Sequence, residues 1–259
     1  LFLILLSIGA GLVLLLGLAV PIMDIDAAQY AAIAREMVER NQFLEVVNRG
    51  RPYLDKPPLV FWTTAASFRL FGVGVIASKI PTLLFAALGI FSTGRLARLF
   101  YGREGERVAL AMMMTVQALF LATSDARTDG LLLGCVGLTA WQLAQYTRTG
   151  RISNLLLAAL GVGLGMLAKG PLGIMVPALG VGSQLVLQRD WRRLVRWQWL
   201  LVPVVALVVL IPMLAALALC AASWSAALSA APDMRSPVMS VTNIFAFFIA
   251  WSPFRSIQT

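Results

Sequence analysis

The stretch SNLLLAALGVGLGMLAKGPLGIMVPALGVGSQLVL, residues 153–187, decides the fold class. It contains one charged residue, Lys169, near its middle. As a single straight helix it would be roughly 50 Å long, well beyond the thickness of a bilayer. Gly170 and Pro171 follow the lysine and interrupt the helix, because proline lacks an amide donor and clashes with the preceding turn. The stretch therefore predicts two short membrane spans joined by a tight turn at Lys169.

The same apolar character extends over the whole chain of 259 residues, of which 59% are hydrophobic and 13% charged. These values exclude a disordered chain and argue against an ordinary soluble domain. Further apolar runs cover residues 1–23, 73–96, 108–123, 131–146 and 198–222, whereas 244–251 is too short to span. We predict an all-α polytopic membrane protein, a bundle of about seven transmembrane helices.

The residue types limit the chemistry. The chain has no histidine, which excludes a Ser-His-Asp triad and a His-based zinc site. Its two cysteines, Cys135 and Cys220, lie in separate apolar runs and form neither a disulfide framework nor a zinc site. Acid–base chemistry must therefore use carboxylates, lysine or tyrosine.

Arginines mark alternate loops. Ten of them fall in three short loops, at positions 95, 98, 103, 107, 148, 151, 189, 192, 193 and 196. The opposing short loops hold only Arg127 and Lys169. The positive-inside rule places the arginine-rich loops in the cytoplasm, so residues 24–72 and the turns at 124–129 and 169–170 face outward. This assignment accounts for the net charge of +9 without nucleic acid.

The outer loop at residues 24–72 holds half of the acidic residues. Apolar side chains at Tyr30, Ile33, Ala34, Met37 and Val38 have helical spacing, which predicts an amphipathic interfacial helix with Asp26 at its N-cap. A proline-rich piece, residues 51–58, and a second interfacial stretch, residues 59–71, follow.

Candidate groups for chemistry lie in these outer segments, and each has a plainer explanation. The carboxylates Asp24 and Asp26 suit a base or a divalent cation, or form a simple helix cap. Lys56, beside Asp55 on a rigid loop, suits a phosphate or only snorkels at the interface. Asp129, next to Arg127, and Lys169 can equally be end-of-helix charges. Together they predict an outward cavity that binds an anionic lipid headgroup and activates a hydroxyl.

The ordered motifs resemble a known family. They are Asp26-Ala-Ala-Gln-Tyr30, Ile33-Ala-Arg-Glu-Met37, Tyr53-Leu-Asp-Lys-Pro-Pro58 with Trp62, Leu70-Phe-Gly72, Asp129, Ala168-Lys-Gly-Pro171 and Val176-Pro177. This set is similar to the polyprenyl-phosphate-sugar-dependent glycosyltransferases of GT-C architecture. The relatives are dolichyl-phosphate-mannose protein mannosyltransferases and bacterial lipid A aminoarabinose transferases.

The resemblance covers residues 1–212, taken as a catalytic module that includes loop 24–72. Residues 213–259 stay unassigned, and the chain is expected to be a fragment of a longer protein. By resemblance, Asp26 and Asp129 are the catalytic carboxylates, and Lys56 contacts the lipid phosphate. The substrate-binding candidates are Lys56, Lys169, Tyr53, Asp55, Arg127 and Gln29. Gln29 stands where the aminoarabinose transferases have arginine, which removes one expected phosphate contact.

The resemblance implies an inverting transfer of sugar from polyprenyl phosphate, such as undecaprenyl phosphate, to a hydroxyl of lipid A, a glycan or a protein. The site would face the periplasm from the bacterial inner membrane. The step needs no nucleotide, the resemblance assigns no definite cofactor, and a divalent metal at Asp24 and Asp26 is an alternative. A rival function is an outward-facing transporter or flippase, but transporters place ionisable groups near the bilayer midplane, and these spans hold almost none. A non-catalytic scaffold is the third alternative.

Overall fold

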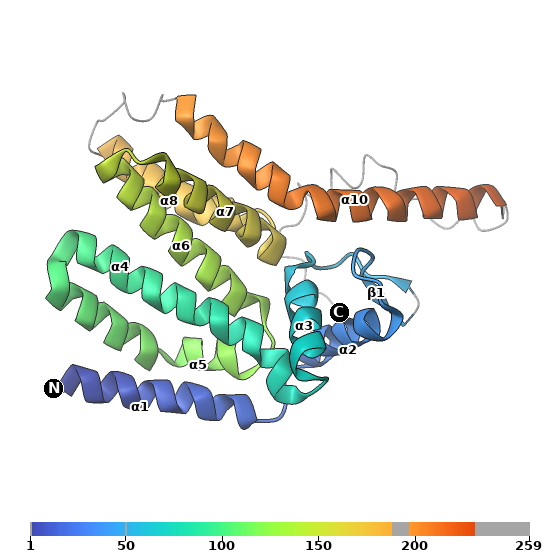
Figure 1. Cartoon of the computed structure of the whole chain (residues 1–259), viewed down its shortest axis with the longest axis horizontal. Helices are drawn as coiled ribbons and strands as arrows, with labels where there is room; N and C mark the ends of the chain where they lie inside the picture. Colours follow the sequence, from blue (N-terminus) through green and yellow to red (C-terminus); the bar gives the residue numbers. More distant parts are fainter. Residues whose placement is uncertain (1, 50, 188–196, 231–259) are drawn as a thin grey trace, which may run out of the picture. The chain divides into compact units, whose positions relative to one another are not determined.

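The computed structural model describes residues 2–49, 51–187 and 197–230. The described elements are α1 (Phe2–Leu16), η1 (Gly17–Ala19), α2 (Ile25–Arg40), β1 (Val47–Asn48), β2 (Arg51–Pro52), α3 (Leu59–Phe71), α4 (Val75–Thr115), α5 (Gln117–Ser124), α6 (Thr128–Thr149), α7 (Ile152–Lys169), α8 (Leu172–Leu187), η2 (Trp197–Leu200) and α10 (Leu201–Ala230). They confirm the all-α prediction, with one small antiparallel pair, β1–β2, in the loop segment 24–72 (Figure 1). The chain divides into two compact units, Leu1–Met213 and Leu214–Thr259.

The hairpin predicted within residues 153–187 is present as α7 and α8. Gly170, the residue that ends α7, has φ +62°, a backbone conformation that glycine adopts without strain. Gly165 and Gly173 let the two helices approach so closely that a Cβ at Gly173 would collide with the Gly165 backbone. The turn at Lys169 is therefore tight, as the Gly-Pro pair indicated.

Helix α4 is two arms of a hairpin, which Figure 1 shows folding back on itself. The bend lies at Gly102, where φ is +70°. The arms pack side by side, because a Cβ at Gly94 would meet Leu110 of the other arm. The predicted span over residues 108–123 is not one continuous helix: α4 ends at Thr115, Val116 is extended, and α5 follows. The Thr115 hydroxyl donates to the carbonyls of Ala111 and Met112, a local bond that favours a break in the helix.

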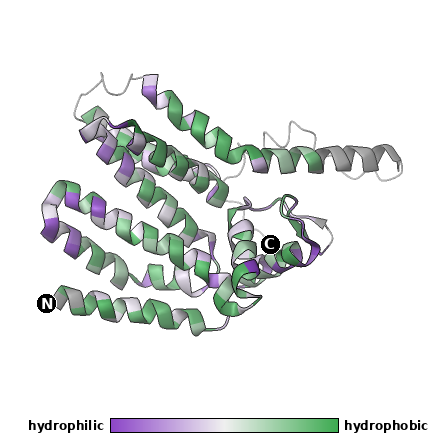
Figure 2. Cartoon of the chain, in the orientation of Figure 1, coloured by the Kyte–Doolittle hydropathy of each residue, from purple (hydrophilic) through white to green (hydrophobic). Residues whose placement is uncertain are grey.

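Helix α6 is the central packing element and contacts α4, α7 and α8. Small residues permit this, since a Cβ at Gly134 would collide with the Phe85 carbonyl of α4 and one at Gly161 with Thr139. By length and composition, three described helical segments can cross a membrane: Val75–Thr115, Ile152–Lys169 and Trp197–Leu219. The shorter apolar helices are Leu5–Ala19, Leu59–Phe71 and Leu172–Gln184. Figure 2 shows apolar colouring along α1, α4, α6, α7 and α8.

Two of the three arginine-rich loops lie at the same end of the bundle. The Arg148 guanidinium, at the end of α6, donates to the Leu99 carbonyl near the α4 bend and stacks over Phe100. Glu106 pairs with Arg95 and Arg98 across that bend. Arg189, Arg192, Arg193 and Arg196 of the third loop lie outside the described residues, as does the apolar run 244–251.

The loop segment 24–72 forms a small helical layer. The predicted amphipathic helix is confirmed as α2, whose buried face contains Ala27, Tyr30, Ile33, Ala34 and Met37. This face packs on α3, which is tied to α4 through the Ser67 hydroxyl and the Ala77 carbonyl at 2.6 Å.

The N-cap prediction for α2 is wrong by two residues. Asp24, and not Asp26, has the extended backbone of an N-cap, and its carboxylate accepts from the Asp26 amide at 3.4 Å. Asp26 itself lies in the first turn, where the helix dipole favours a carboxylate.

Candidate active site

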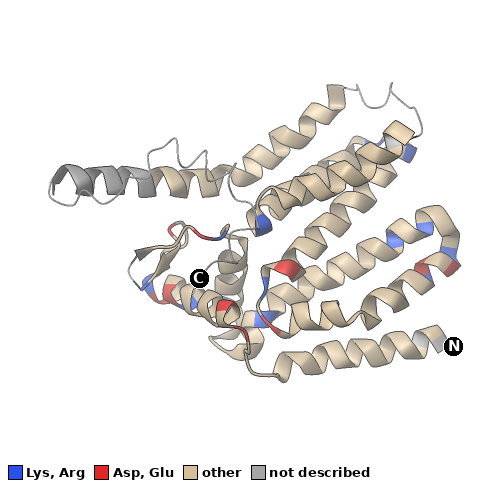
Figure 3. Ribbon diagram, turned by 180° about the vertical axis from the view of Figure 1, so that it is seen from behind, with Lys and Arg blue, Asp and Glu red and all other residues tan. Residues whose placement is uncertain are grey.

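Acidic and basic side chains meet at the end of the bundle opposite the α4 bend. In Figure 3, charged positions gather near α2 and the adjoining helix ends and at the α4 bend, while the middles of the long helices carry almost none. Two described segments distant in sequence are joined here, since Asp24 pairs with Arg127 at 2.9 Å. The ion pair connects the start of α2 to the residue before α6.

Asp26 faces a pair of tyrosines. The Tyr30 hydroxyl, one turn later on α2, lies 3.4 Å from an Asp26 carboxylate oxygen. The rings of Tyr30 and Tyr53 both make edge contacts with the buried Phe61 ring, with centroids 5.5 Å and 5.7 Å away. Phe61 of α3 thereby holds the two hydroxyl-bearing rings on the same side as Asp26.

Burial and the nearby carboxylates keep both tyrosines neutral. Burial, then the charge of Asp26, raises the pKa of Tyr30 well above its ordinary value. Burial, followed by the charges of Asp55 and Asp26, raises the pKa of Tyr53 to about 12. The two phenols are therefore hydrogen-bond donors at neutral pH and are unsuited to act as bases. Asp26 has no ion pair with any described residue, so its carboxylate is available to a ligand.

Asp129 has a different environment. It lies in the first turn of α6 and forms an ion pair with Lys169, the last residue of α7. Each charge is also at the helix end that favours it, the carboxylate at an N-terminus and the ammonium at a C-terminus. The pair neutralises itself and stays partly open to solvent, with the lysine side chain 31% exposed and the carboxylate 50%.

Lys56 is half-buried on the loop between β2 and α3, and Asp55 beside it is exposed. Neither the Lys56 ammonium nor the Gln29 amide has an ion pair or side-chain hydrogen bond to any residue in the described ranges. The structure thus brings Asp24 to Arg127, Asp129 to Lys169, and Asp26 to Tyr30, while Tyr53 packs on the same Phe61 ring as Tyr30. It leaves Lys56 as a cation without a counterion among the described residues.

The residues do not form an evident metal site. Asp24 is engaged by Arg127 and by the Asp26 amide. Across the described residues, no three acidic, cysteine or histidine side chains are grouped closely enough to hold a metal ion. The Asp24 and Asp26 pair is therefore better explained as a cap followed by a free carboxylate.

Three residues near the site were not among the predicted site residues. Tyr30 could have been found from its spacing, because positions four apart on a helix face each other. Lys79 carried the signal of a lysine inside an apolar run, which indicates a functional or structural ion partner. Asp125 gave no signal beyond its place in a predicted outer turn, yet its carboxylate is buried and accepts from the Met23 amide at 3.1 Å.

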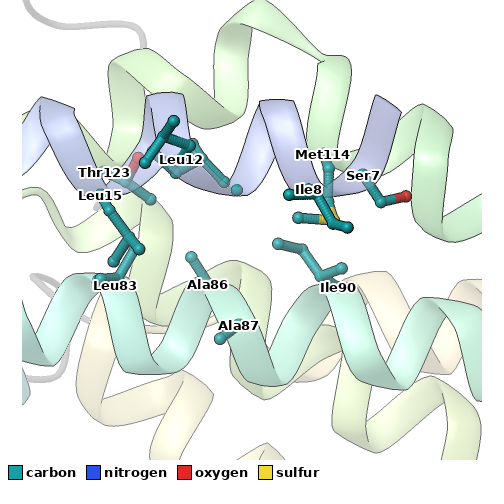
Figure 4. A pocket seen from close by; sticks show the side chains of 12 residues that line it. Ser7, Ile8, Leu12, Leu15, Leu83, Ala86, Ala87, Ile90, Met114 and Thr123 are labelled. Atoms are coloured by element: carbon teal, nitrogen blue, oxygen red, sulfur yellow. The ribbon is translucent and has the colours of Figure 1, made fainter. Parts of the chain in front are cut away.

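An apolar cavity of about 470 Å³ lies between α1 and α4. Leu12, Leu15, Leu83 and Ile90 line it, as Figure 4 shows, together with Met114 from the second arm of α4. Its lining contains no charged residue. The cavity therefore suits a hydrocarbon chain and does not suit a polar headgroup.

Most of the chain is similar in sequence to known proteins. The sequence profile described as Dolichyl-phosphate-mannose-protein mannosyltransferase matches residues 55–216. Undecaprenyl phosphate-alpha-4-amino-4-deoxy-L-arabinose arabinosyl transferase of Pseudomonas paraeruginosa is 28% identical over 192 residues, which is 72% of this chain and 35% of that protein. The enzyme of the same name from Shewanella sediminis is 30% identical over 200 residues, which is again 72% of this chain and 35% of that protein. The chain spans about a third of the length of these relatives.

Two solved structures have the same fold. Apo ArnT from Cupriavidus metallidurans superposes with a TM-score of 0.74 and 20% identity, over 97% of this chain and 44% of that one. ArnT from the same organism bound to undecaprenyl phosphate superposes with a TM-score of 0.73 and 21% sequence identity. The match covers 86% of this chain and 42% of that one. The likeness confirms the predicted GT-C-like helical membrane fold.

Proposed function

The chain belongs to the dolichyl-phosphate-mannose-protein mannosyltransferase family, and from that premise we propose that it forms the catalytic transmembrane part of an inverting glycosyltransferase. The donor is a sugar linked to a polyprenyl phosphate, and the acceptor is a hydroxyl. The observation that carries this proposal is Asp26, a carboxylate in the first turn of α2 with no cation bound to it among the described residues. A general base needs such an unpaired carboxylate within reach of the hydroxyl.

Asp26 accepts the proton of the acceptor hydroxyl while that oxygen attacks the anomeric carbon. The bond between the anomeric carbon and the phosphate oxygen breaks, and its electron pair leaves with the polyprenyl phosphate. Tyr30 and Tyr53, held neutral, donate hydrogen bonds to sugar oxygens or to the carboxylate. Proton, sugar and leaving group are thus all accounted for without a metal.

Lys56 stabilises the phosphate as negative charge develops on it. Its ammonium is half-buried and has no competing carboxylate partner among the described residues. An ammonium in this setting favours the transition state more than an ion-paired one, because no existing salt bridge has to break. Lys169 and Arg127, each already paired with a carboxylate, adjust the electrostatic potential around the donor phosphate. Gln29, Asp55 and Asp129 contribute contacts to the sugar or to the acceptor.

The hydrocarbon tail of the donor occupies an apolar groove between helices, of which the cavity between α1 and α4 is one candidate. A solved structure of similar fold, ArnT of Cupriavidus metallidurans, is bound to undecaprenyl phosphate, which supports this choice of lipid. The site faces the periplasmic side of the inner membrane, as the arginine distribution favours. Residues 1–212 are the catalytic module in this proposal.

A transporter is less consistent with the geometry. The paired and unpaired charges gather at helix ends and in the first outer loop, whereas transport sites are formed by broken helices near the bilayer midplane.

The test uses proteoliposomes of the complete protein that contains these residues. Polyprenyl-phosphate sugars, including mannose, aminoarabinose and galacturonic acid, are each supplied with lipid A, a glycan or a Ser/Thr peptide. We expect release of free polyprenyl phosphate from one donor and appearance of the sugar on one acceptor. Absence of release with every pair, from folded protein, would contradict the proposal. Movement of the intact donor across the bilayer would support the transporter.

A further inference from the structure

The extended segment that leads from η1 to α2 is held by side chains from elsewhere in the fold. The Lys79 ammonium of α4 donates to the Val20 carbonyl at 2.5 Å and to the Gly17 carbonyl at 3.4 Å. Three residues later, the Met23 amide donates to Asp125 at 3.1 Å. The next residue, Asp24, is paired with Arg127. These contacts define a clamp made of Lys79, Asp125 and Arg127 around residues 17–24.

Two members of the clamp are buried charges. Lys79 is completely buried and Asp125 is 3% exposed. The Asp125 carboxylate acts electrostatically on the Lys79 ammonium, although the two make no direct ion pair. A buried charge is unfavourable unless polar partners satisfy it. Lys79 obtains these partners from the carbonyls of Gly17 and Val20 at the C-terminal end of the α1–η1 helical segment, where carbonyl groups favour a cation; the Gly17 carbonyl also accepts from the Val20 amide at 3.3 Å.

The clamp lies next to both candidate carboxylates. Asp24, which Arg127 holds, caps α2, and Asp26 follows two residues later. On the other side, Asp125 and Arg127 belong to the short connection from α5 to α6, and Asp129 lies in the first turn of α6. The same few side chains therefore tie the start of α2 and the start of α6 to one anchor on α4.

We propose that Lys79 and Asp125 are positioning residues that fix Asp26 relative to Asp129 by holding the segment between η1 and α2. They contact neither the donor nor the acceptor. This inference rests on the proposed function for its catalytic consequence, but its structural consequence is measurable without any turnover.

The variants separate the hydrogen bonds from the charge. Lys79→Met keeps the length of the side chain and removes the donor to the two carbonyls. Asp125→Leu removes the acceptor for the Met23 amide, whereas Asp125→Asn keeps an oxygen there and removes the charge. Ser92→Ala is the matched control, because Ser92 is fully buried on the same helix and its hydroxyl has no hydrogen-bond partner in the described part of the chain.

Spin labels report the position of α2. Cysteines are placed at Ala28, an exposed residue of α2, and at Met175, an exposed residue of α8, which packs on α6. The background carries Cys135→Ala and Cys220→Ala in the complete protein, and only monodisperse preparations are measured. Double electron–electron resonance measures the distribution of distances between the two labels. We expect Lys79→Met and Asp125→Leu to shift or broaden this distribution. Asp125→Asn and Ser92→Ala should leave it as in the parent.

Kinetics with the preferred donor supply the second measurement. A carboxylate displaced by about 1 Å should lower kcat roughly tenfold to a hundredfold. KM for the donor should change less than about threefold, because the donor contacts remain. Asp125→Asn should keep most of the kcat that Asp125→Leu loses. An unchanged distance distribution in both disruptive variants, or a changed one with normal kcat, would overturn the inference. If the parent shows no sugar transfer but the variants still change the distance distributions, the proposed function is contradicted. The structural role of Lys79 and Asp125 in holding residues 17–24 is then still supported.

Discussion

The loop segment 24–72 and the α6–α7 end of the bundle each supply one candidate catalytic carboxylate and one candidate lysine, yet they arrange them in opposite ways. In the loop, Asp26 and Lys56 have no ionic partner among the described residues. At the α6–α7 end, Asp129 and Lys169 are bound to each other. Similar residue types thus produce two uncompensated charges in one region and a neutral pair in the other. The difference assigns the chemical step to the loop and a supporting role to the pair.

The largest effect is expected at Asp26. Replacement by Asn keeps the shape and removes the basic oxygen, so kcat should fall by a factor of about 10² to 10⁴. Glu39→Gln is the control, since Glu39 is an exposed acid of the same helix that pairs with Arg35. Steady-state transfer in proteoliposomes measures both. A kcat for Asp26→Asn close to that of Glu39→Gln would remove the distinction between the two regions.

Lys56 should come second. A hydrogen bond to a charged group contributes about 1.5–3 kcal/mol, so Lys56→Ala should weaken binding of undecaprenyl phosphate roughly tenfold to a hundredfold. Lys56→Arg should retain part of the affinity. Arg69→Ala, an exposed basic residue of α3, should leave it unchanged. Titration with the lipid in detergent micelles gives the constants, and equal losses for Lys56→Ala and Arg69→Ala would argue against a specific phosphate contact.

The sequence predicted most of this fold, because apolar runs and glycine-proline breaks are local signals. The hairpin at Lys169 and the amphipathic helix after Asp24 were both readable from spacing. The end of α4 at Thr115 was not, since residues 108–123 are mostly apolar and contain neither glycine nor proline to mark the break. The N-cap was placed at Asp26, since the sequence pattern alone does not show which of two aspartates two residues apart begins the helix.

The candidate residues were likewise predicted, but their pairing was not. Nothing in the sequence shows that Lys169 belongs to Asp129 and that Lys56 has no such partner, because those relations depend on how α6, α7 and the loop meet. Lys79 and Asp125 were missed as a pair for the same reason. Their contacts to residues 17–23 bridge 59 and 102 positions of the chain.

A double-mutant cycle at Asp129 and Lys169 should give a smaller energy. The pair is partly exposed, and solvent screening limits such pairs to a coupling of roughly 0.2–1 kcal/mol. Asp129→Asn, Lys169→Met and the double variant are compared by chemical denaturation and by kcat. Asp129→Asn should reduce kcat less than Asp26→Asn does. A coupling of several kcal/mol, or equal losses of kcat at the two acids, would show that the regions are equivalent.

Tyr53 should make the stability of the protein depend on pH. Its pKa is raised to about 12, above the ordinary value of 10, because burial and the nearby carboxylates disfavour the phenolate. The raised pKa means that folding favours the protonated phenol, so this contribution to stability is complete below pH 10 and declines as the pH rises toward 12. The difference in Tm between the parent and Tyr53→Phe should therefore become smaller above pH 10, because only the parent loses this contribution to stability. Parallel Tm curves throughout would contradict the placement of Tyr53 beside Asp26 and Asp55.

The proposed mechanism depends most on Asp26 acting in the chemical step. Single-turnover transfer by protein that already holds the donor tests this directly. The complete protein, its Asp26→Asn variant and its Asp129→Asn variant are each saturated with the same polyprenyl-phosphate sugar and mixed with acceptor. We predict that Asp26→Asn binds the donor within about threefold of the parent but transfers the sugar at least about a hundredfold more slowly, with Asp129→Asn between the two. Transfer by Asp26→Asn at the rate of the parent would contradict the account.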